Sequence, residues 1–267
     1  MLKARYSVLD LVAMVLILGT AFGLVSWQWK NRLMESTSQV RSQLLKAVFQ
    51  SPLPGHAVTA ERPVPDSEAY KGKYQFSDNW FTYHIPVWER VLAPFQGKPG
   101  VQYLEVGLYE GRSAVWMLEH VLTHPTARLT GIDPFLGPYK SKYHANIESS
   151  GLSPKVTTIA DYSQVALRKL PLNAYDIIYV DGSHAKDDVL EDAVLCSRLL
   201  KEGGILIFDD YQWVGCMAHG TCDSAEDFPK AAIDPFVQCF EKEFEVIHNS
   251  NQLILRRRKA PLTPGSA

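Results

Sequence analysis

Between residues 101 and 258, short runs of apolar and β-branched residues alternate with stretches whose apolar positions recur at helical spacing. The runs predict five strands, at Val101–Val106, Arg128–Ile132, Val156–Ala160, Asp176–Val180 and Gly204–Phe208. The stretches predict four helices, at Arg112–Leu122, Lys140–Ser150, Ser163–Leu170 and Ala185–Leu200. Strands separated by helices of this length cannot pair as hairpins. They therefore predict right-handed β-α-β units and a parallel sheet that is covered on both faces.

Two further runs near the C-terminus, Phe244–His248 and Gln252–Arg258, are separated by Asn249, Ser250 and Asn251. A connection this short predicts an antiparallel hairpin. The expected fold class is therefore α/β: a doubly wound, Rossmann-like, mostly parallel seven-stranded sheet with a C-terminal antiparallel hairpin. Such a sheet binds its ligand outside the carboxyl ends of the strands, so we look for functional residues there.

An uncharged apolar segment, Leu11–Trp27, follows a short basic leader. As a helix it would be roughly 25 Å long, at the short end of what spans a hydrocarbon core. We predict an uncleaved, single-pass transmembrane helix. A cleaved signal peptide is the alternative, because Ala21 and Gly23 form a small-x-small cleavage site. More positive charges follow the segment than precede it, which favours a cytoplasmic catalytic domain.

Composition narrows the class of protein. Of the 267 residues, 46% are hydrophobic and 21% are charged, which is typical of a globular protein. Lys and Arg number 27 and Asp and Glu 29, so the formal charge is −2 and no basic field is available to hold nucleic acid. The four cysteines are too few for a disulfide scaffold. Cys216 and Cys222 can pair if oxidised, but we expect reduced thiols.

The first expected strand ends in a glycine-rich turn. Gly107 and Gly111 let the backbone pass close to a ligand, and the helix that follows offers free N–H groups. Tyr109 stands where a dinucleotide fingerprint needs a glycine, which argues against NAD. Asp133 ends the second strand, 22 residues beyond Gly111, where a carboxylate can accept both ribose hydroxyls of a nucleoside. A turn or a helix cap is the alternative role for Asp133.

Acidic residues also end the fourth and fifth expected strands. Asp181 follows the fourth strand, and Asp209 and Asp210 follow the fifth. Because neighbouring strand ends lie about 5 Å apart, these three carboxylates would converge and need a cation. Oxygen ligands suit Mg²⁺ or Ca²⁺. The alternative is that Asp181 or Ser183 caps the next helix and that one of the two consecutive aspartates points away.

Three segments carry a resemblance to a known family: EVGLYEGRSAVWMLEHV, IDPF and YDIIYVDGSHAKDDVLEDAVLCSRLLKEGGILIFDDYQW. They resemble class I S-adenosylmethionine-dependent methyltransferases, in the branch of the metal-dependent catechol-type and sugar O-methyltransferases. The resemblance covers residues 101–258. It implies S-adenosyl-L-methionine as the cofactor and Mg²⁺ or another divalent cation in the active site.

The resemblance also implies roles for single residues. The cofactor would contact Glu105, Gly107, Gly111 and Ser113 at the glycine-rich turn, Asp133 at the ribose, and Asp161 and Ser163 beside the adenine. The metal would lie on Asp181, Asp209 and Asp210. The catalytic residues would be Asp181 and His184, with the histidine as general base, which its usual pKa of about 6.5 suits.

The expected protein is a membrane-anchored methyltransferase that acts on a hydroxyl of a small molecule, a sugar or a lipid-linked acceptor. Its expected parts are residues 1–30 as leader and anchor, 31–73 as helical stalk and proline-rich linker, 74–258 as methyltransferase domain and 259–267 as disordered tail. Two alternatives stay open. One is a tethered module that binds the cofactor or a partner without turnover, and the other is a nucleotide-dependent oxidoreductase, which Tyr109 disfavours.

Two other segments allow more than one interpretation. Phe76–Trp88 is unusually aromatic and can cover the cofactor pocket or line the acceptor site. It can equally form a helix whose Trp80, Ile85 and Trp88 pack on the core. We interpret Trp213–Phe228 as a lid or an insertion after the fifth strand.

Overall fold

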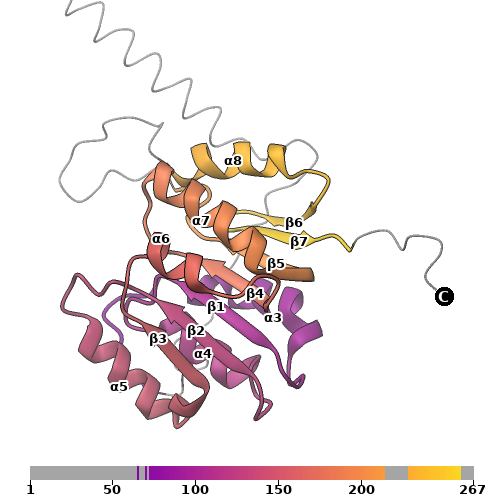
Figure 1. The fold of residues 1–267 in the computed structure, drawn as a ribbon. Helices are drawn as coiled ribbons and strands as arrows, with labels where there is room; N and C mark the ends of the chain where they lie inside the picture. The colour runs from indigo at the N-terminus through magenta and orange to yellow at the C-terminus, as the bar shows by residue number, and fades with distance from the viewer. Residues whose placement is uncertain (1–64, 66–69, 71, 214–227, 260–267) are drawn as a thin grey trace, which may run out of the picture. The chain divides into compact units, whose positions relative to one another are not determined.

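The computed structural model describes residues 72–213 and 228–259, together with Pro65 and Tyr70. They belong to the compact unit Phe49–Ala267. Their strands are β1 (Gln102–Val106), β2 (Arg128–Ile132), β3 (Val156–Ile159), β4 (Tyr175–Val180), β5 (Leu200–Phe208), β6 (Phe244–Asn249) and β7 (Leu253–Arg257). They form one sheet in the order β3-β2-β1-β4-β5-β7-β6, in which β7 pairs antiparallel with β5 and β6 and the other pairs are parallel (Figure 1). The predicted doubly wound sheet and its terminal hairpin are confirmed.

Helices cover both faces of the sheet. They are α3 (Ile85–Leu92), α4 (Arg112–His120), α5 (Lys140–Ser150), α6 (Ser163–Ala166), α7 (Lys186–Leu199) and α8 (Pro229–Cys239). The first three pack on one face and the last three on the other, which makes three layers (Figure 1). Three-residue 3₁₀ turns η1 (Thr82–His84), η2 (Ala93–Phe95), η3 (Ser153–Lys155) and η4 (Leu167–Lys169) adjoin these elements.

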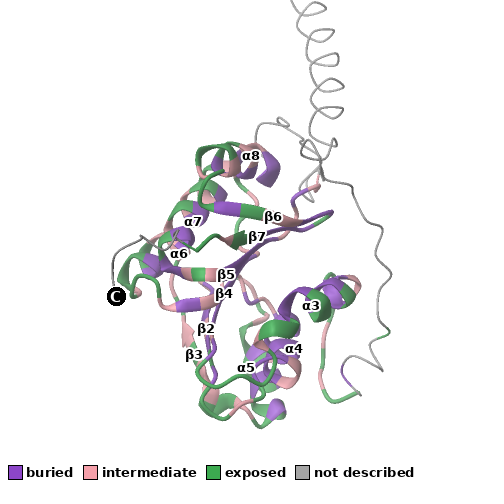
Figure 2. Cartoon of the chain, turned by 90° about the vertical axis from the view of Figure 1, so that its right-hand side faces the viewer, coloured by how far each residue is buried: buried purple, intermediate pink, exposed green. Residues whose placement is uncertain are grey.

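The alternation of side chains along each central strand explains the two cores. Tyr103 of β1 and Tyr179 of β4 belong to the core under α3, α4 and α5, whereas Leu104 and Ile178 belong to the core under α6, α7 and α8. Figure 2 shows the buried residues along the sheet and on the inner sides of the helices. Strands that are apolar on both faces must be covered twice, as the sequence predicted.

Two elements differ from the prediction. Helix α8 was not predicted, because Pro229 begins it and Pro235 lies inside it, where proline normally ends a helix. Strand β5 begins at Leu200, earlier than the predicted Gly204, and passes through Gly203 at a φ of +77°. Glycine tolerates this conformation, so the strand continues through a position that suggested a break.

The aromatic segment before the sheet packs on the core as one of the two interpretations predicted, except for its first tryptophan. Ile85 and Trp88 of α3 are buried. Trp80 is 59% exposed and contacts the ring of Tyr109 at a centroid distance of 5.3 Å. Its expected place in the core is wrong.

Other predictions fall on parts of the chain that are not described. The expected anchor Leu11–Trp27 and the cysteines Cys216 and Cys222 lie outside the described residues. Among the helices of residues 72–213 and 228–259, none has the length and hydropathy needed to cross a bilayer. The membrane anchor stays a prediction.

Candidate active site

The glycine-rich turn between β1 and α4 is built on close backbone contacts. Gly107 has a φ of +88°, and a Cβ added to it would lie 1.9 Å from the carbonyl oxygen of Asp181. Gly111 has a φ of +81° and precedes α4 without a side-chain cap. The turn therefore lies directly against the end of β4 and leaves the first N–H groups of α4 available to a ligand.

Glu105 lies under this turn and is fully buried. Its Oε2 accepts a hydrogen bond of 2.9 Å from the Tyr103 hydroxyl, and its Oε1 accepts one from the Ser113 hydroxyl. Burial raises the pKa of Glu105 to about 8, although both hydrogen bonds favour the ionised form. Glu105 and Ser113, predicted separately as cofactor contacts, thus form one hydrogen-bonded pair in the floor of the turn.

Asp133 holds the turn from the end of β2. Its Oδ2 accepts backbone N–H bonds from Leu108 at 2.9 Å and Tyr109 at 3.1 Å, and its Oδ1 accepts one from Phe135 at 2.6 Å. The turn-forming role that the sequence left as an alternative is therefore present. A carboxylate has about four acceptor positions, so one is left for a ribose hydroxyl, and that contact stays a prediction.

Asp161 and Ser163 follow β3, which pairs with β2 through Ile132 and Ile159. The predicted adenine contacts thus lie beside the predicted ribose contact. Ser163 begins α6 and hydrogen-bonds the side chain of Asp192 on α7. Burial raises the pKa of Asp192, a residue the sequence did not single out, to about 7.

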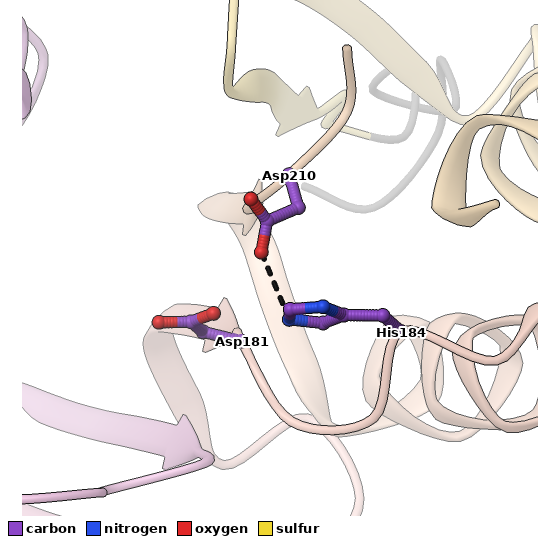
Figure 3. A group of neighbouring side chains, drawn as sticks. All are labelled: Asp181, His184 and Asp210. Carbon is purple, nitrogen blue, oxygen red and sulfur yellow. Dashed lines mark ion pairs between the residues drawn. The ribbon is translucent and has the colours of Figure 1, made fainter. Parts of the chain in front are cut away.

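A second group of polar side chains gathers at the ends of β4 and β5. Asp181, His184 and Asp210 each offer a ligand atom, and these atoms lie within 4.8 Å of one another (Figure 3). The Nε2 atom of His184 lies 2.9 Å from Oδ2 of Asp210. Asp210 has a φ of +52°, which is unusual for a non-glycine residue and directs its side chain toward His184.

Asp209, a predicted metal ligand, is not in this group. Its Oδ2 accepts the Tyr179 hydroxyl, and its Oδ1 accepts a 3.2 Å hydrogen bond from Gln252 and pairs with Nε2 of His84 at 3.4 Å. The physical reason is that consecutive residues at a strand end point in opposite directions. The structure thus adds His184 to the predicted carboxylates and turns Asp209 away.

The pKa values of the carboxyl groups in this region are shifted in different directions. Burial raises the pKa of the Asp181 carboxyl, and Asp209 and Asp210 raise it further. Burial also acts on Asp209, but His84 and Tyr179 hold the pKa of Asp209 below its usual range. The Tyr179 hydroxyl lies 2.9 Å from Asp181 and also contacts Asp209, yet it has one proton and can donate to only one of them. An additional positive charge beside Asp181 is therefore favourable, and the donor set fits a divalent cation.

His184 lies among both polar and aromatic neighbours. The hydrogen bond to Asp210 raises the pKa of His184, while burial opposes the shift. The indole of Trp213 packs edge-on against the imidazole at a centroid distance of 4.9 Å. The imidazole is thus held between a carboxylate and an aromatic ring, the arrangement of an oriented base.

Comparison with known proteins identifies the domain. Residues 104–211 match the family model described as a methyltransferase domain. This part of the chain, which runs from β1 to β5, is therefore similar to a methyltransferase domain. A curated relative, "Uncharacterized protein R132" of Acanthamoeba polyphaga mimivirus, is 29% identical over 155 residues, which cover 54% of this chain and 68% of the relative. The methyltransferase resemblance predicted from the sequence is confirmed over residues 104–211.

Solved structures share the fold of the methyltransferase domain. The SAH-bound methyltransferase PaMTH1 of Podospora anserina has a TM-score of 0.54 and 18% identity, over 75% of this chain and 91% of that one. MycE from the mycinamycin biosynthetic pathway, in complex with Mg, SAH and mycinamycin VI, has a TM-score of 0.50 and 16% identity, over 76% of this chain and 57% of its own. At these identities the likeness shows the fold alone.

A pocket of the methyltransferase domain adjoins the group of Asp181, His184 and Asp210. Apolar side chains form much of its wall: Val180, Val189, Phe208 and Pro229. The polar group thus lies in a partly apolar pocket, where hydrogen bonds and charges act more strongly than in water. With a volume of about 10 Å³, this pocket has room for little more than one water molecule or one small ion beside the polar group.

Sequence reasoning missed three polar residues of the methyltransferase domain that surround this group. Tyr179 lies two positions before Asp181, on the same face of β4, and strand periodicity could have found it. His84 and Gln252 come from the segment before the sheet and from the hairpin connection. No spacing in the sequence links them to Asp209, since only the folded sheet brings them there.

Proposed function

We propose that the domain methylates a hydroxyl group and that His184 is the general base, oriented by Asp210. The observation that carries the proposal is the 2.9 Å contact between His184 Nε2 and Asp210 Oδ2 at the carboxyl edge of the sheet. A nucleophile needs a nearby base, and the base in turn needs a group that orients it. Both requirements are met beside the pocket.

Bound S-adenosylmethionine supplies an electrophilic methyl group, and residues of the chain bind the cofactor and remove the proton of the acceptor hydroxyl. The turn at Gly107 and Gly111 and the carboxylate of Asp133 would hold the cofactor, and Asp161 and Ser163 would lie at its adenine. Nε2 of His184 faces Asp210, so Nδ1 takes the hydroxyl proton. Asp210 then stabilises the imidazolium, and the apolar wall excludes water.

A divalent cation fits the same region. Mg²⁺ prefers oxygen ligands, so Asp181 and Asp210 would hold it and leave the imidazole of His184 to act as base. Nitrogen-seeking metals such as Zn²⁺ and Ni²⁺ would also bind the imidazole. We therefore expect Mg²⁺ to support methyl transfer and Zn²⁺ to inhibit it, whereas equal support by both metals would contradict the base role of His184.

The acceptor class is a small molecule, a sugar or a lipid-linked hydroxyl compound. Support comes from the fold shared with MycE, whose structure contains Mg, SAH and mycinamycin VI. Screening such hydroxyl compounds for release of SAH would identify the acceptor. Amines or thiols methylated in preference to hydroxyls would contradict O-methylation.

The direct test uses the full-length chain in detergent. Calorimetry should detect S-adenosylmethionine and not NAD, which separates a methyltransferase from an oxidoreductase. His184→Ala should slow turnover by about 10²–10⁴-fold, the usual contribution of a general base, and leave SAH affinity unchanged. If S-adenosylmethionine binds but no acceptor is methylated, and Asp181→Ala and His184→Ala leave that binding unchanged, the protein is instead a binding module without turnover.

We also propose that Leu11–Trp27 anchors the protein in a membrane with the domain in the cytosol. Support comes from its uncharged apolar run and from the excess of positive charge that follows it. In intact cells, the domain should be protected from added protease. A mature N-terminus near Leu24, or digestion of the domain from outside, would contradict the anchor.

A further inference from the structure

His84 lies outside the residues matched by the family model, yet its side chain reaches the active site. It ends the 3₁₀ turn η1 before the sheet and is 1% exposed. Its Nε2 lies 3.4 Å from Oδ1 of Asp209, at the end of β5. A buried histidine from the aromatic segment thus lies against one of the two consecutive aspartates.

A second contact from the same segment reaches the same carboxylate oxygen. The Trp88 indole N–H donates a 2.7 Å hydrogen bond to Oε1 of Gln252, and Nε2 of Gln252 donates to Oδ1 of Asp209 at 3.2 Å. The Trp88 and Gln252 side chains are completely buried. Two independent contacts therefore fix one oxygen of Asp209, which is more than packing of an aromatic segment requires.

The other oxygen of Asp209 continues the chain of contacts. It accepts the hydroxyl of Tyr179, which also lies 2.9 Å from Oδ2 of Asp181. Polar contacts thus run without a break from His84 through Asp209 and Tyr179 to Asp181. Among the described residues, the side chain of Asp181 has no hydrogen bond other than the one with Tyr179.

We propose that His84 is a positioning residue for methyl transfer: it holds Asp209 against Tyr179 and so fixes the carboxylate of Asp181 in the active site. Without His84, Oδ1 of Asp209 loses its contact with Nε2 and keeps the 3.2 Å hydrogen bond from Gln252, so Asp209 turns more readily toward Asp181 and Asp210, where a third carboxylate changes the geometry of the group. Groups that orient a metal ligand commonly change metal affinity or activity by about 10–100-fold. The inference rests on the proposed function, because it assumes that Asp181 and Asp210 bind a cation.

The test measures binding of Mn²⁺, as a probe for a divalent cation, to the full-length chain saturated with SAH. His84→Ala should weaken Mn²⁺ binding by about 10–100-fold and leave SAH affinity unchanged. His84→Gln should restore most of the affinity, because the amide nitrogen of Gln can replace Nε2. Methyl transfer should lose kcat, with little change in the KM for S-adenosylmethionine.

A matched control separates positioning from packing. His120 on α4 stacks on Trp116 in the same aromatic core, with ring centroids 4.9 Å apart, but has no contact with Asp209. His120→Ala should therefore leave Mn²⁺ affinity unchanged. An equal loss in His120→Ala and His84→Ala would mean that any loosening of this core disturbs the site, and the positioning role would be overturned.

Tyr179→Phe tests the chain from its other end if His84→Ala does not fold. It removes one hydroxyl and keeps the buried ring, and it should weaken Mn²⁺ binding to a similar extent. If either Tyr179→Phe or His84→Ala binds Mn²⁺ with wild-type affinity, the positioning role of His84 is overturned and the proposed function is not. Failure of the wild-type protein to bind Mn²⁺ overturns the cation in the proposed function as well, so the two failures are distinguishable.

Discussion

The carboxylates at the ends of β1 and β2 and those at the ends of β4 and β5 are stabilised in different ways. Glu105 accepts two hydroxyl hydrogen bonds, and Asp133 accepts three from the backbone. Asp181 has one donor, Tyr179, which it shares with Asp209. Glu105 and Asp133 thus each have two or three donors of their own, whereas Asp181 has no donor that it does not share.

This difference distinguishes carboxylates that stabilise a turn of the fold from carboxylates that bind a proton or a cation. A buried carboxylate with its donors in place is stable without a ligand and can fix a turn. Carboxylates that face one another need a proton or a cation. Substitutions on the cofactor side, at the ends of β1 and β2, should therefore lower the stability of the fold. Substitutions on the cation side, at the ends of β4 and β5, should lower methyl transfer.

The largest loss of stability is expected at Gly107, where the turn after β1 contacts the end of β4. Gly107→Ala would place a Cβ 1.9 Å from the Asp181 carbonyl oxygen at a φ of +88°. Gly151→Ala is the matched control, since Gly151 has a φ of +71° and no atom within 4 Å of an added Cβ. Positive φ alone costs about 1–2 kcal/mol. In chemical denaturation, Gly107→Ala should lose clearly more than this or fail to fold, and equal losses would disprove the close contact.

Much of the cofactor side could be predicted from the sequence, because it depends on local pattern. The alternation of strands and helices, the Gly107 turn and the strand-end Asp133 are each visible within a few residues of sequence. The cation side depends on distant residues. Alternation along the strand predicted that one of the two consecutive aspartates points away, but that it is Asp209 follows from His84 and Gln252, which lie on either side of it in sequence and meet only in the fold.

The second prediction concerns Asp133. Asp133→Asn would place an amide N–H near the backbone N–H groups of Leu108 and Tyr109, so at least one charge-assisted hydrogen bond is lost. Such bonds contribute about 1.5–3 kcal/mol. The free energy of unfolding of the cofactor-free protein should fall by that amount, and S-adenosylmethionine affinity should fall as well. A variant of unchanged stability would show that Asp133 does not hold the turn.

Asp181→Asn should have the opposite effect on stability. It removes a carboxyl that faces Asp209 and Asp210 while keeping an acceptor for the Tyr179 hydroxyl. Relief of unfavourable charge commonly adds about 0.5–2 kcal/mol. The metal-free variant should therefore melt at a higher temperature than the wild type and lose methyl transfer. If it is less stable than the wild type in metal-free buffer, the comparison between the two sides is wrong.

The smallest change in a single measurement is the loss of stability from pH 7 to pH 8 that Glu105 contributes. Its pKa is about 8 in the folded protein and near 4.5 when unperturbed. Between these values the folded chain keeps a proton that the unfolded chain releases, so stability falls as pH rises through this window and levels off above pH 8. One such proton changes the free energy of unfolding by at most about 1.4 kcal/mol per pH unit.

Glu105→Gln should flatten this slope, which can be measured by urea denaturation of the cofactor-free protein at pH 7 and pH 8. The variant should fold, because the hydroxyls of Tyr103 and Ser113 can accept from an amide as well as donate. Asp192 is the matched control: its pKa is about 7, so Asp192→Asn should flatten the slope chiefly below pH 7. If the slope between pH 7 and pH 8 is the same in Glu105→Gln as in the wild type, Glu105 is already ionised under the turn. The comparison between the carboxylates at the ends of β1 and β2 and Asp181 would then be supported by Asp133 alone.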